Sequence, residues 1–271
     1  MAITITISGE ERKRRLGEAN NQRFFSAHGL LNEHNGWRDS KLHLFIGPTG
    51  AGKSTLTRSL LLDCLVGTNN KFIAGLWLSE ETTSEFITEI NHVKIPDHIG
   101  DRVVVESEQE MEFKTCNNWL LSLKSFIEKN NLDILFLDNI TTSIFYNDAD
   151  SKEQARIARA LKKLAQIMDI PIVILAHTSA EITETYPRMI NLENIRGSKN
   201  LTNMVEFAYI IQPFFHHGEK HVFIRIAKHR GQDVQNRIFK FYYYCNQKIY
   251  GKSEPKPFDQ FKELFNKREK L

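Results

Sequence analysis

Gly47-Pro48-Thr49-Gly50-Ala51-Gly52-Lys53-Ser54-Thr55 is the stretch that decides the fold of this chain. Its spacing is G-x-x-x-x-G-K-[ST], in which glycines let the backbone curl so that successive N–H groups point at phosphate oxygens. The apolar run 42–46 before it predicts a strand, and the Leu-rich run 55–65 after it predicts a helix whose N-terminus is positive. This context indicates a nucleotide phosphate site rather than a glycine-rich turn that binds nothing.

Two side chains of the loop, and one further along the chain, have the chemistry of a nucleotide–magnesium site. We expect residues 47–55 to contact the nucleotide, Lys53 to reach its β/γ-phosphates and the Ser54 hydroxyl to hold Mg²⁺. Asp138 ends a predicted, almost wholly apolar strand, which is the Walker B pattern for a second magnesium ligand. The sequence therefore predicts ATP, or a similar nucleotide, and Mg²⁺ as cofactors.

The composition is that of an ordinary globular protein. The chain has 271 residues, of which 41% are hydrophobic and 25% charged, and its net charge is +3. Three scattered cysteines without metal spacing argue against a disulfide framework and for a reducing compartment. No apolar run approaches the roughly 18 residues of a membrane span. We therefore expect a cytoplasmic protein with no membrane partner.

Three zones differ in composition. Residues 1–40 are polar and predict an N-terminal extension with a linker helix. Residues 41–250 alternate apolar strands with amphipathic helices, which predicts an α/β ATPase core with a largely parallel sheet. Residues 251–271 form a tail in which Phe258, Phe261 and Phe265 have roughly helical spacing. This tail predicts an amphipathic helix, whose rings pack on the protein's own core or else dock a partner.

Within the core, the pattern predicts strands at 72–79, 132–137, 172–176, 205–211, 222–227 and 237–244. A helix is predicted at 82–93. Another is predicted after Ser151, its expected cap, with one apolar face made by Ile157, Ala158, Leu161, Leu164, Ala165 and Met168.

Polar residues at predicted strand ends are the catalytic candidates. Glu80 is the first residue past the second strand and is suited to orient and deprotonate water, with Glu81 a close alternative. Both glutamates also suit a helix start, where acidic residues favour the dipole. His177 follows the fourth strand and is placed to contact a γ-phosphate. Lys228 and Arg230 follow a late strand, and from position alone they are ordinary basic loop residues.

Taken in order, these motifs resemble RecA-like ATPases, and most of all the helicase domain of ring-shaped replicative helicases, the DnaB family and the phage primase-helicases. The loop at 47–55 is unspecific. Leu78-Ser79-Glu80 is similar to the strand-end glutamate of that family. The run 154–180, QARIARALKKLAQIMDIPIVILAHTSA, resembles its helix, strand and sensor. Ile195-Arg196-Gly197-Ser198 and Ala227-Lys228-His229-Arg230-Gly231 are similar to its LRGS segment and its later K-x-R.

The resemblance implies a RecA-like P-loop core, a central, mostly parallel twisted sheet flanked by helices. It implies that Glu80 is the catalytic carboxylate and His177 the γ-phosphate sensor. Arg230, with Lys228, would be the finger inserted into the neighbouring subunit's site. The expected assembly is therefore a homo-oligomer, a hexameric ring with each site at a subunit interface.

The resemblance also implies DNA-facing loops at about 142–151 and 179–200. Arg188, Arg196 and Lys199 in the second suit phosphates. Asp148 and Asp150 in the first would repel them, which departs from the family. A second departure is that residues 1–40 are too short for the family's amino-terminal partner domain.

Two functions are therefore expected from the sequence. The first is an ATP-hydrolysing ring that translocates on or unwinds single-stranded DNA, as a replicative helicase does. The alternative is a regulatory RecA/KaiC-like ATPase that assembles or switches a protein complex without unwinding, because the Glu80-Glu81 pair resembles the paired glutamates of KaiC-like domains. A replication or regulatory protein is the corresponding partner.

Overall fold

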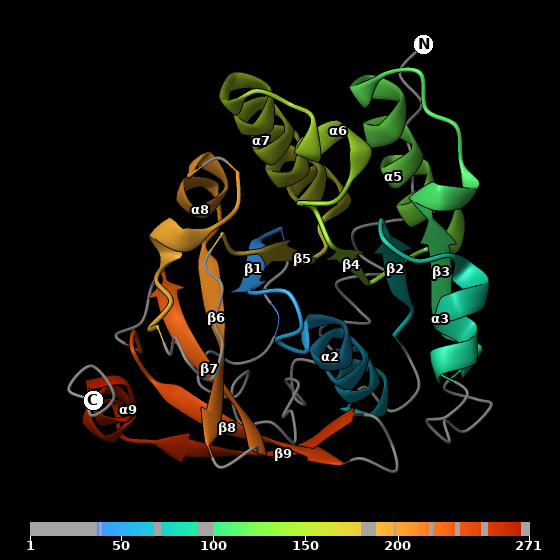
Figure 1. Ribbon diagram of the computed structural model, residues 1–271. Helices are drawn as coiled ribbons and strands as arrows, with labels where there is room; N and C mark the ends of the chain where they lie inside the picture. The colour runs from blue at the N-terminus through green and yellow to red at the C-terminus, as the bar shows by residue number, and fades with distance from the viewer. Residues whose placement is uncertain are drawn as a thin grey trace.

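A central sheet organises the molecule (Figure 1). The computed structural model describes residues 37, 40–67, 72–90, 100–179, 188–197, 199–216, 219–230, 234–244 and 249–266. Within them a nine-stranded sheet has the order β3-β2-β4-β5-β1-β6-β7-β8-β9. Its strands are β1 (Leu42–Gly47), β2 (Ala74–Leu78), β3 (Val103–Ser107), β4 (Ile134–Asp138), β5 (Ile172–His177), β6 (Phe207–His216), β7 (Glu219–His229), β8 (Ile238–Tyr244) and β9 (Ile249–Lys256).

The sheet has a parallel half and an antiparallel half. Every pair from β3 across to β6 is parallel, so the carboxyl ends of these strands meet at one edge. From β6 to β9 the pairs are antiparallel. The predicted α/β fold, a mostly parallel sheet flanked by helices, is confirmed.

Helices cover both faces of the sheet. The helical elements are α2 (Lys53–Gly67), α3 (Thr83–Ile90), η2 (Glu108–Glu110), α5 (Cys116–Asn130), α6 (Ile144–Asn147), α7 (Ser151–Met168), η3 (Leu192–Asn194), α8 (Asn200–Met204) and α9 (Phe258–Asn266). In Figure 1, α5, α6 and α7 lie on one side of the sheet and α2 on the other. None of the helices in the described ranges has the length and apolar character that crossing a bilayer requires.

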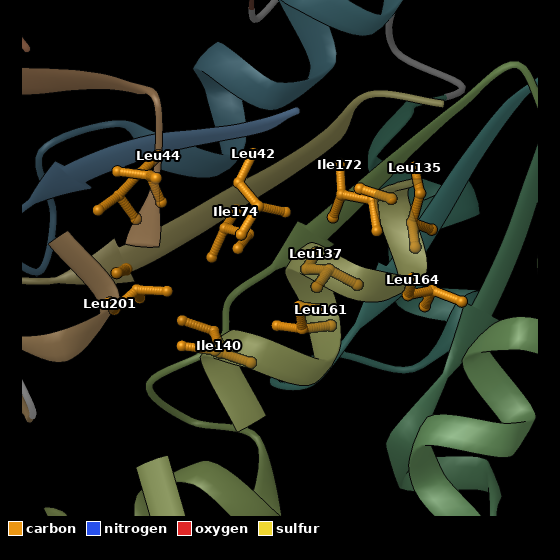
Figure 2. Packing of buried hydrophobic residues seen from close by; sticks show 14 of the residues in the cluster. Leu42, Leu44, Leu135, Leu137, Ile140, Leu161, Leu164, Ile172, Ile174 and Leu201 are labelled. Atoms are coloured by element: carbon orange, nitrogen blue, oxygen red, sulfur yellow. The ribbon is translucent and has the colours of Figure 1, made fainter. Parts of the chain in front are cut away.

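Alternation along the strands builds two hydrophobic cores. Successive strand residues face opposite sides, so Leu44 joins the core under α5 and α7 while Phe45 joins the core under α2. Figure 2 shows part of the first core, where α7 packs on the sheet. Its labelled residues are Leu42, Leu44, Leu135, Leu137, Ile140, Leu161, Leu164, Ile172, Ile174 and Leu201.

Helix α7 has the apolar face that the sequence predicts, but its cap differs. All six predicted apolar residues are buried. Asp150, not Ser151, is the N-cap, because its carboxylate accepts hydrogen bonds from the backbone N–H groups of Lys152 and Glu153 at 2.9 and 2.8 Å. Asp169 ends the helix in a left-handed conformation with φ 53°.

The sequence analysis did not predict β3, α5 and β9, nor the short helical elements η2, α6, η3 and α8. Strand β3 lies at the sheet edge and is only half-buried, so its alternation carries little signal. Strand β9 crosses residue 250, so the sheet continues into the segment assigned to the tail. The prediction for residues 1–40 lies outside the described residues, apart from Trp37 and Ser40.

The tail's aromatic rings pack on the protein itself. Helix α9 places Phe261 and Phe265 among the buried residues, 2% and 5% exposed, in a cluster with Phe214 and Phe223 of the antiparallel half. This is the own-core alternative of the sequence analysis. The helix therefore covers part of the surface formed by β6, β7 and β8.

A buried carboxylate joins three elements behind the carboxyl edge of the sheet. Glu108 Oε1 accepts hydrogen bonds from Trp77 Nε1 at 2.8 Å, Trp119 Nε1 at 2.7 Å and Ser143 Oγ at 3.0 Å. Burial raises the pKa of Glu108, and these donors oppose the rise. The cluster ties β2, α5 and the turn before α6 together.

Glu108→Leu is expected to lower the free energy of unfolding by about 3 kcal/mol, because it leaves two indole N–H groups and a hydroxyl buried without their acceptor. Urea unfolding followed by far-UV circular dichroism measures it. Glu112→Leu, at an exposed position nearby, is the matched control and should change stability by less than about 0.5 kcal/mol. Equal stability of the two variants would show that the cluster does not stabilise the fold.

Candidate functional site

A cleft opens where the carboxyl ends of β1, β2, β4 and β5 meet. Its volume is about 640 Å³, within the usual size of a small-molecule site. Elements from the whole chain line it: Thr49, Gly50, Gly52, Lys53, Ser54, Thr55, Arg58, Glu80, Glu81, Glu89, Asp138, Asn139, His177, Lys220, Val222, Tyr243 and Tyr250. The loop, the candidate catalytic carboxylates and the candidate sensor thus share one cavity.

The phosphate-binding loop runs from the end of β1 into the N-terminus of α2. Gly52 has φ +92°, and a Cβ there would lie 2.5 Å from Tyr250 Oη, so both the backbone conformation and the space require glycine. The 15 residues of α2 begin at Lys53, which directs the positive end of the helix dipole into the cleft. The loop therefore has the geometry that holds phosphate groups.

Lys53 is buried, and its ammonium is held by the loop. Nζ donates to the carbonyl oxygens of Pro48 at 3.0 Å and Gly47 at 3.3 Å, and lies 2.8 Å from His177 Nδ1. Burial lowers the pKa of Lys53 to about 8, although Asp138 and Glu80 act in the opposite direction. Lys53 is therefore mostly charged at neutral pH.

His177 connects Lys53 to Glu80. Its Nε2 lies 2.9 Å from Glu80 Oε1, which only accepts, and its Nδ1 faces Lys53 Nζ, which only donates. With hydrogen on Nε2 the neutral ring pairs with both of these groups, although Asn139 Nδ2, which only donates, also lies 3.0 Å from Nε2. Thr49 Oγ1, at 3.3 Å, is a second donor to Nδ1. The imidazole therefore links the loop to the carboxylate at the end of β2.

Glu80 and Glu81 differ in environment. Hydrogen bonding to His177, with Asn139 Nδ2 a further donor at 2.6 Å, lowers the pKa of Glu80 to about 2. Glu80 is therefore ionised, and in this arrangement it is better suited to orient water than to remove its proton. Burial raises the pKa of Glu81, opposed by the charge of Arg58. Glu80 thus contacts His177, the candidate sensor, whereas Glu81 interacts electrostatically with Arg58.

Asp138 and Ser54 supply the donor set that suits magnesium. Asp138 is buried, and desolvation raises its pKa to about 6, while a hydrogen bond with Ser54 and the charge of Lys53 oppose the rise. A carboxylate beside a hydroxyl matches the oxygen ligands of Mg²⁺. The residues present therefore fit the ion, whose charge would offset the desolvation of Asp138.

Asn139 is a site residue that the sequence analysis missed. Its side chain donates to Glu80, and its backbone N–H donates to Ser79 Oγ at 2.9 Å. Ser79 Oγ in turn donates to the Asn139 carbonyl at 2.5 Å. The available signal was its position directly after Asp138. Arg58, Glu89, Lys220, Tyr243 and Tyr250 also line the cleft without having been predicted.

Five predicted residues lie away from this cleft. Lys228 and Arg230, at the far end of β7, do not line it, and neither do Arg188, Arg196 and Lys199. Arg188, Arg196, Lys199 and Arg230 are exposed, and Lys228 is half-buried. The chain's own nucleotide cleft therefore brings together the loop, Glu80, Asp138 and His177, but not the basic residues assigned to a neighbour or to DNA.

Asp138→Asn is expected to stabilise the nucleotide-free protein at pH 8 by up to about 3 kcal/mol, because the shift of its pKa from 3.8 to about 6 is a cost of burying the charge. That cost is present above the folded pKa and disappears as the carboxyl is protonated. The gain should therefore shrink as pH falls through 6 toward 4. Urea unfolding at pH 8 and pH 4.5 measures it, in parallel with loss of magnesium-dependent ATP hydrolysis. A variant that is less stable than the parent at pH 8 would contradict the assignment.

The family model of the AAA domain matches residues 31–181, more than half of the 271-residue chain. No curated protein matches the chain. The matched range contains the phosphate-binding loop, Glu80, Asp138 and His177, the residues that share the cleft. The chain therefore belongs to the AAA domain family and is a P-loop ATPase.

Proposed function

We propose that this P-loop ATPase forms a ring, a hexamer, and couples ATP hydrolysis to movement along single-stranded DNA, as a replicative helicase does. Each nucleotide site lies between two copies in this proposal. The observation that carries it is the position of Arg230, which lies at the opposite end of the sheet from the chain's own phosphate-binding loop.

The sheet register fixes that position. His229 pairs with Phe207 in β6, and Phe207 pairs with His43 near the start of β1. The phosphate-binding loop follows Gly47, four residues later in β1. A strand rises about 3.3 Å per residue, so the level of His43 is about 13 Å from Gly47 along the strand direction. Arg230, which follows His229, is therefore at least about that far from the phosphate-binding loop. If Arg230 acts on a nucleotide, that nucleotide belongs to another copy of the chain.

Main-chain carbonyls hold both basic residues at this end. Lys228 Nζ donates to the Thr202 carbonyl at 2.7 Å, and Arg230 Nη2 donates to the Asn203 carbonyl at 3.3 Å. These carbonyls belong to the last turn of α8, where a cation is favoured. Arg230 remains exposed, as a residue that stabilises charge on a neighbour's transferred phosphoryl group requires.

In this proposal, different residues of the chain's own cleft have different roles in hydrolysis. Lys53 and the N-terminus of α2 bind the phosphates, and Glu80 orients the attacking water. Ser54 and Asp138 would hold Mg²⁺, which neutralises phosphate charge when bound. When Lys53 turns to a phosphate oxygen, His177 Nδ1 loses its strongest donor. The His177–Glu80 hydrogen bond then responds to the state of the nucleotide.

The sensor residue directly contacts the basic segment that we assign to DNA. The Arg196 backbone N–H donates to the His177 carbonyl at 2.8 Å, and Thr178 pairs with Ile195. Gly197 has φ +94°, and a Cβ there would meet Gln154 of α7 and Tyr146 of α6 at 3.1 and 3.2 Å. The two segments assigned to DNA thus pack on each other beside the sensor.

The acidic residues of the first segment weigh less against DNA than the sequence suggests. Asp150 caps α7, so its carboxylate is engaged by backbone N–H groups. Asp148 accepts a hydrogen bond from Asn147 Nδ2 at 3.0 Å. Both aspartates therefore have a local structural role, and their presence in this segment does not by itself argue against DNA binding.

A regulatory ATPase of the KaiC-like type is the second candidate. This candidate is favoured because Glu80 and Glu81 both line the cleft. The DNA motor proposed above uses only one carboxylate, Glu80, to orient water. The regulatory ATPase switches a protein complex, so its turnover responds to a protein partner and not to DNA.

Steady-state ATP hydrolysis should rise several-fold when single-stranded DNA is added at protein concentrations that form rings, because DNA bound by Arg188, Arg196 and Lys199 acts on the sensor. The stimulation should fall at raised salt, since phosphate contacts release counterions. Double-stranded DNA of the same length is the control. A turnover rate that ignores DNA at every concentration would favour the regulatory ATPase.

Arg230→Ala is expected to lower turnover by about 1,000-fold while leaving nucleotide affinity largely unchanged. Mixing this variant with Lys53→Ala, itself inactive, should restore part of the activity, because some interfaces then combine an intact loop with an intact arginine. Arg159→Ala, at an exposed position on α7, is the control for charge. Full activity of Arg230→Ala alone would rule out the finger.

A further inference from the structure

Lys220 reaches the phosphate-binding loop from the antiparallel half of the sheet. Gly47, the last residue of β1, lies against Ile211 of β6. A Cβ added at Gly47 would be 3.0 Å from the Cβ of Ile211. Lys220 pairs with Phe215, four residues further along β6. The β6–β7 hairpin therefore extends past the end of β1 and over the loop.

The lysine ammonium contacts the loop itself. Lys220 is an exposed residue, yet its Nζ donates a hydrogen bond to the Gly50 carbonyl, 170 positions earlier in the chain. It lies close enough to Lys53 for its charge to lower the pKa of that residue. Partial desolvation also lowers the pKa of Lys220. The ammonium groups of Lys53 and Lys220 therefore both contact the phosphate-binding loop, Lys53 from the buried side and Lys220 from the β6–β7 hairpin.

The charges of the cleft leave Lys220 available for a ligand. Among the described residues that line it, the cations are Lys53, Arg58 and Lys220, against four carboxylates. Arg58 is paired with Glu89 and lies over the ring of Phe86. The acidic residues Glu80 and Asp138 come from strands on the β5 side of β1, whereas Lys220 comes from the β6 side. Phosphates held by the loop would therefore have carboxylates on one side and Lys220 on the other.

We propose that Lys220 is a second phosphate-binding cation in cis, exchanging the Gly50 carbonyl for an oxygen of the nucleotide's terminal phosphates. The ammonium gains a charge-assisted hydrogen bond in place of a neutral acceptor. The contribution of Lys220 to nucleotide affinity should therefore be larger for nucleotides with more phosphates, so that it favours a triphosphate over a monophosphate. The proposal rests on the ATP site and is independent of a ring or of DNA.

The test is equilibrium binding of AMP, ADP and a non-hydrolysable ATP analogue to the full chain without DNA. Lys220→Ala should weaken the ATP analogue about 10-fold, ADP less and AMP not measurably. The loss should be smaller at high salt, because the interaction is between charges. Lys220→Arg should retain affinity within about 3-fold, since a guanidinium also binds phosphate. Lys163→Ala, which removes a charge from an exposed position on α7, should match the parent chain.

Two results would overturn the proposal. Equal weakening of all three nucleotides by Lys220→Ala, accompanied by a lower melting temperature, would mean that the lysine only supports the loop through Gly50. Unchanged affinity for the ATP analogue would mean that it does not contact the phosphates. Either result leaves the DNA motor intact, while a parent chain that binds ATP without responding to DNA contradicts only the motor.

Discussion

The parallel register of β1, β2, β4 and β5 is the constraint on which the site depends. Gly47, the last residue before the loop, pairs with His177, and Leu78 pairs with Asp138. Parallel strands end at the same edge, so these two pairings bring the loop, His177, Asp138 and Glu80 into one cleft. A slip of one residue in either pair would turn each side chain to the opposite face.

The cleft holds charges that the fold alone would not favour. Desolvation lowers the pKa of Lys53 and raises that of Asp138, so each is less favourable as an ion than it is in water. Hydrogen bonding instead favours the charged form of Glu80. Such opposed shifts in one cavity are typical of functional sites, where stability is lost to prepare groups for a ligand. A bound nucleotide with its cation would supply counter-charges for Lys53 and Asp138.

Strand β7, in the antiparallel half of the sheet, has basic residues at both of its ends. One end of β7 carries Lys220 to the chain's own loop, and the other carries Lys228 and Arg230 to the opposite end of the sheet. A single strand of 11 residues therefore spans the distance between the two ends. The strand pairs with β6 along most of its length and with β8 over Val222–Arg225.

The sequence by itself determined the strand–loop–helix at 42–65, the strand ending at Asp138 and the apolar face of α7, because these are local patterns of spacing and periodicity. It also placed Glu80 and His177 at strand ends. Only the tertiary structure decided that Asn139 joins them, that Glu108 fastens β2, α5 and the turn before α6, and that Lys220 meets Gly50. These contacts join residues that are remote in sequence, and they exist because the strand order and register bring the segments together.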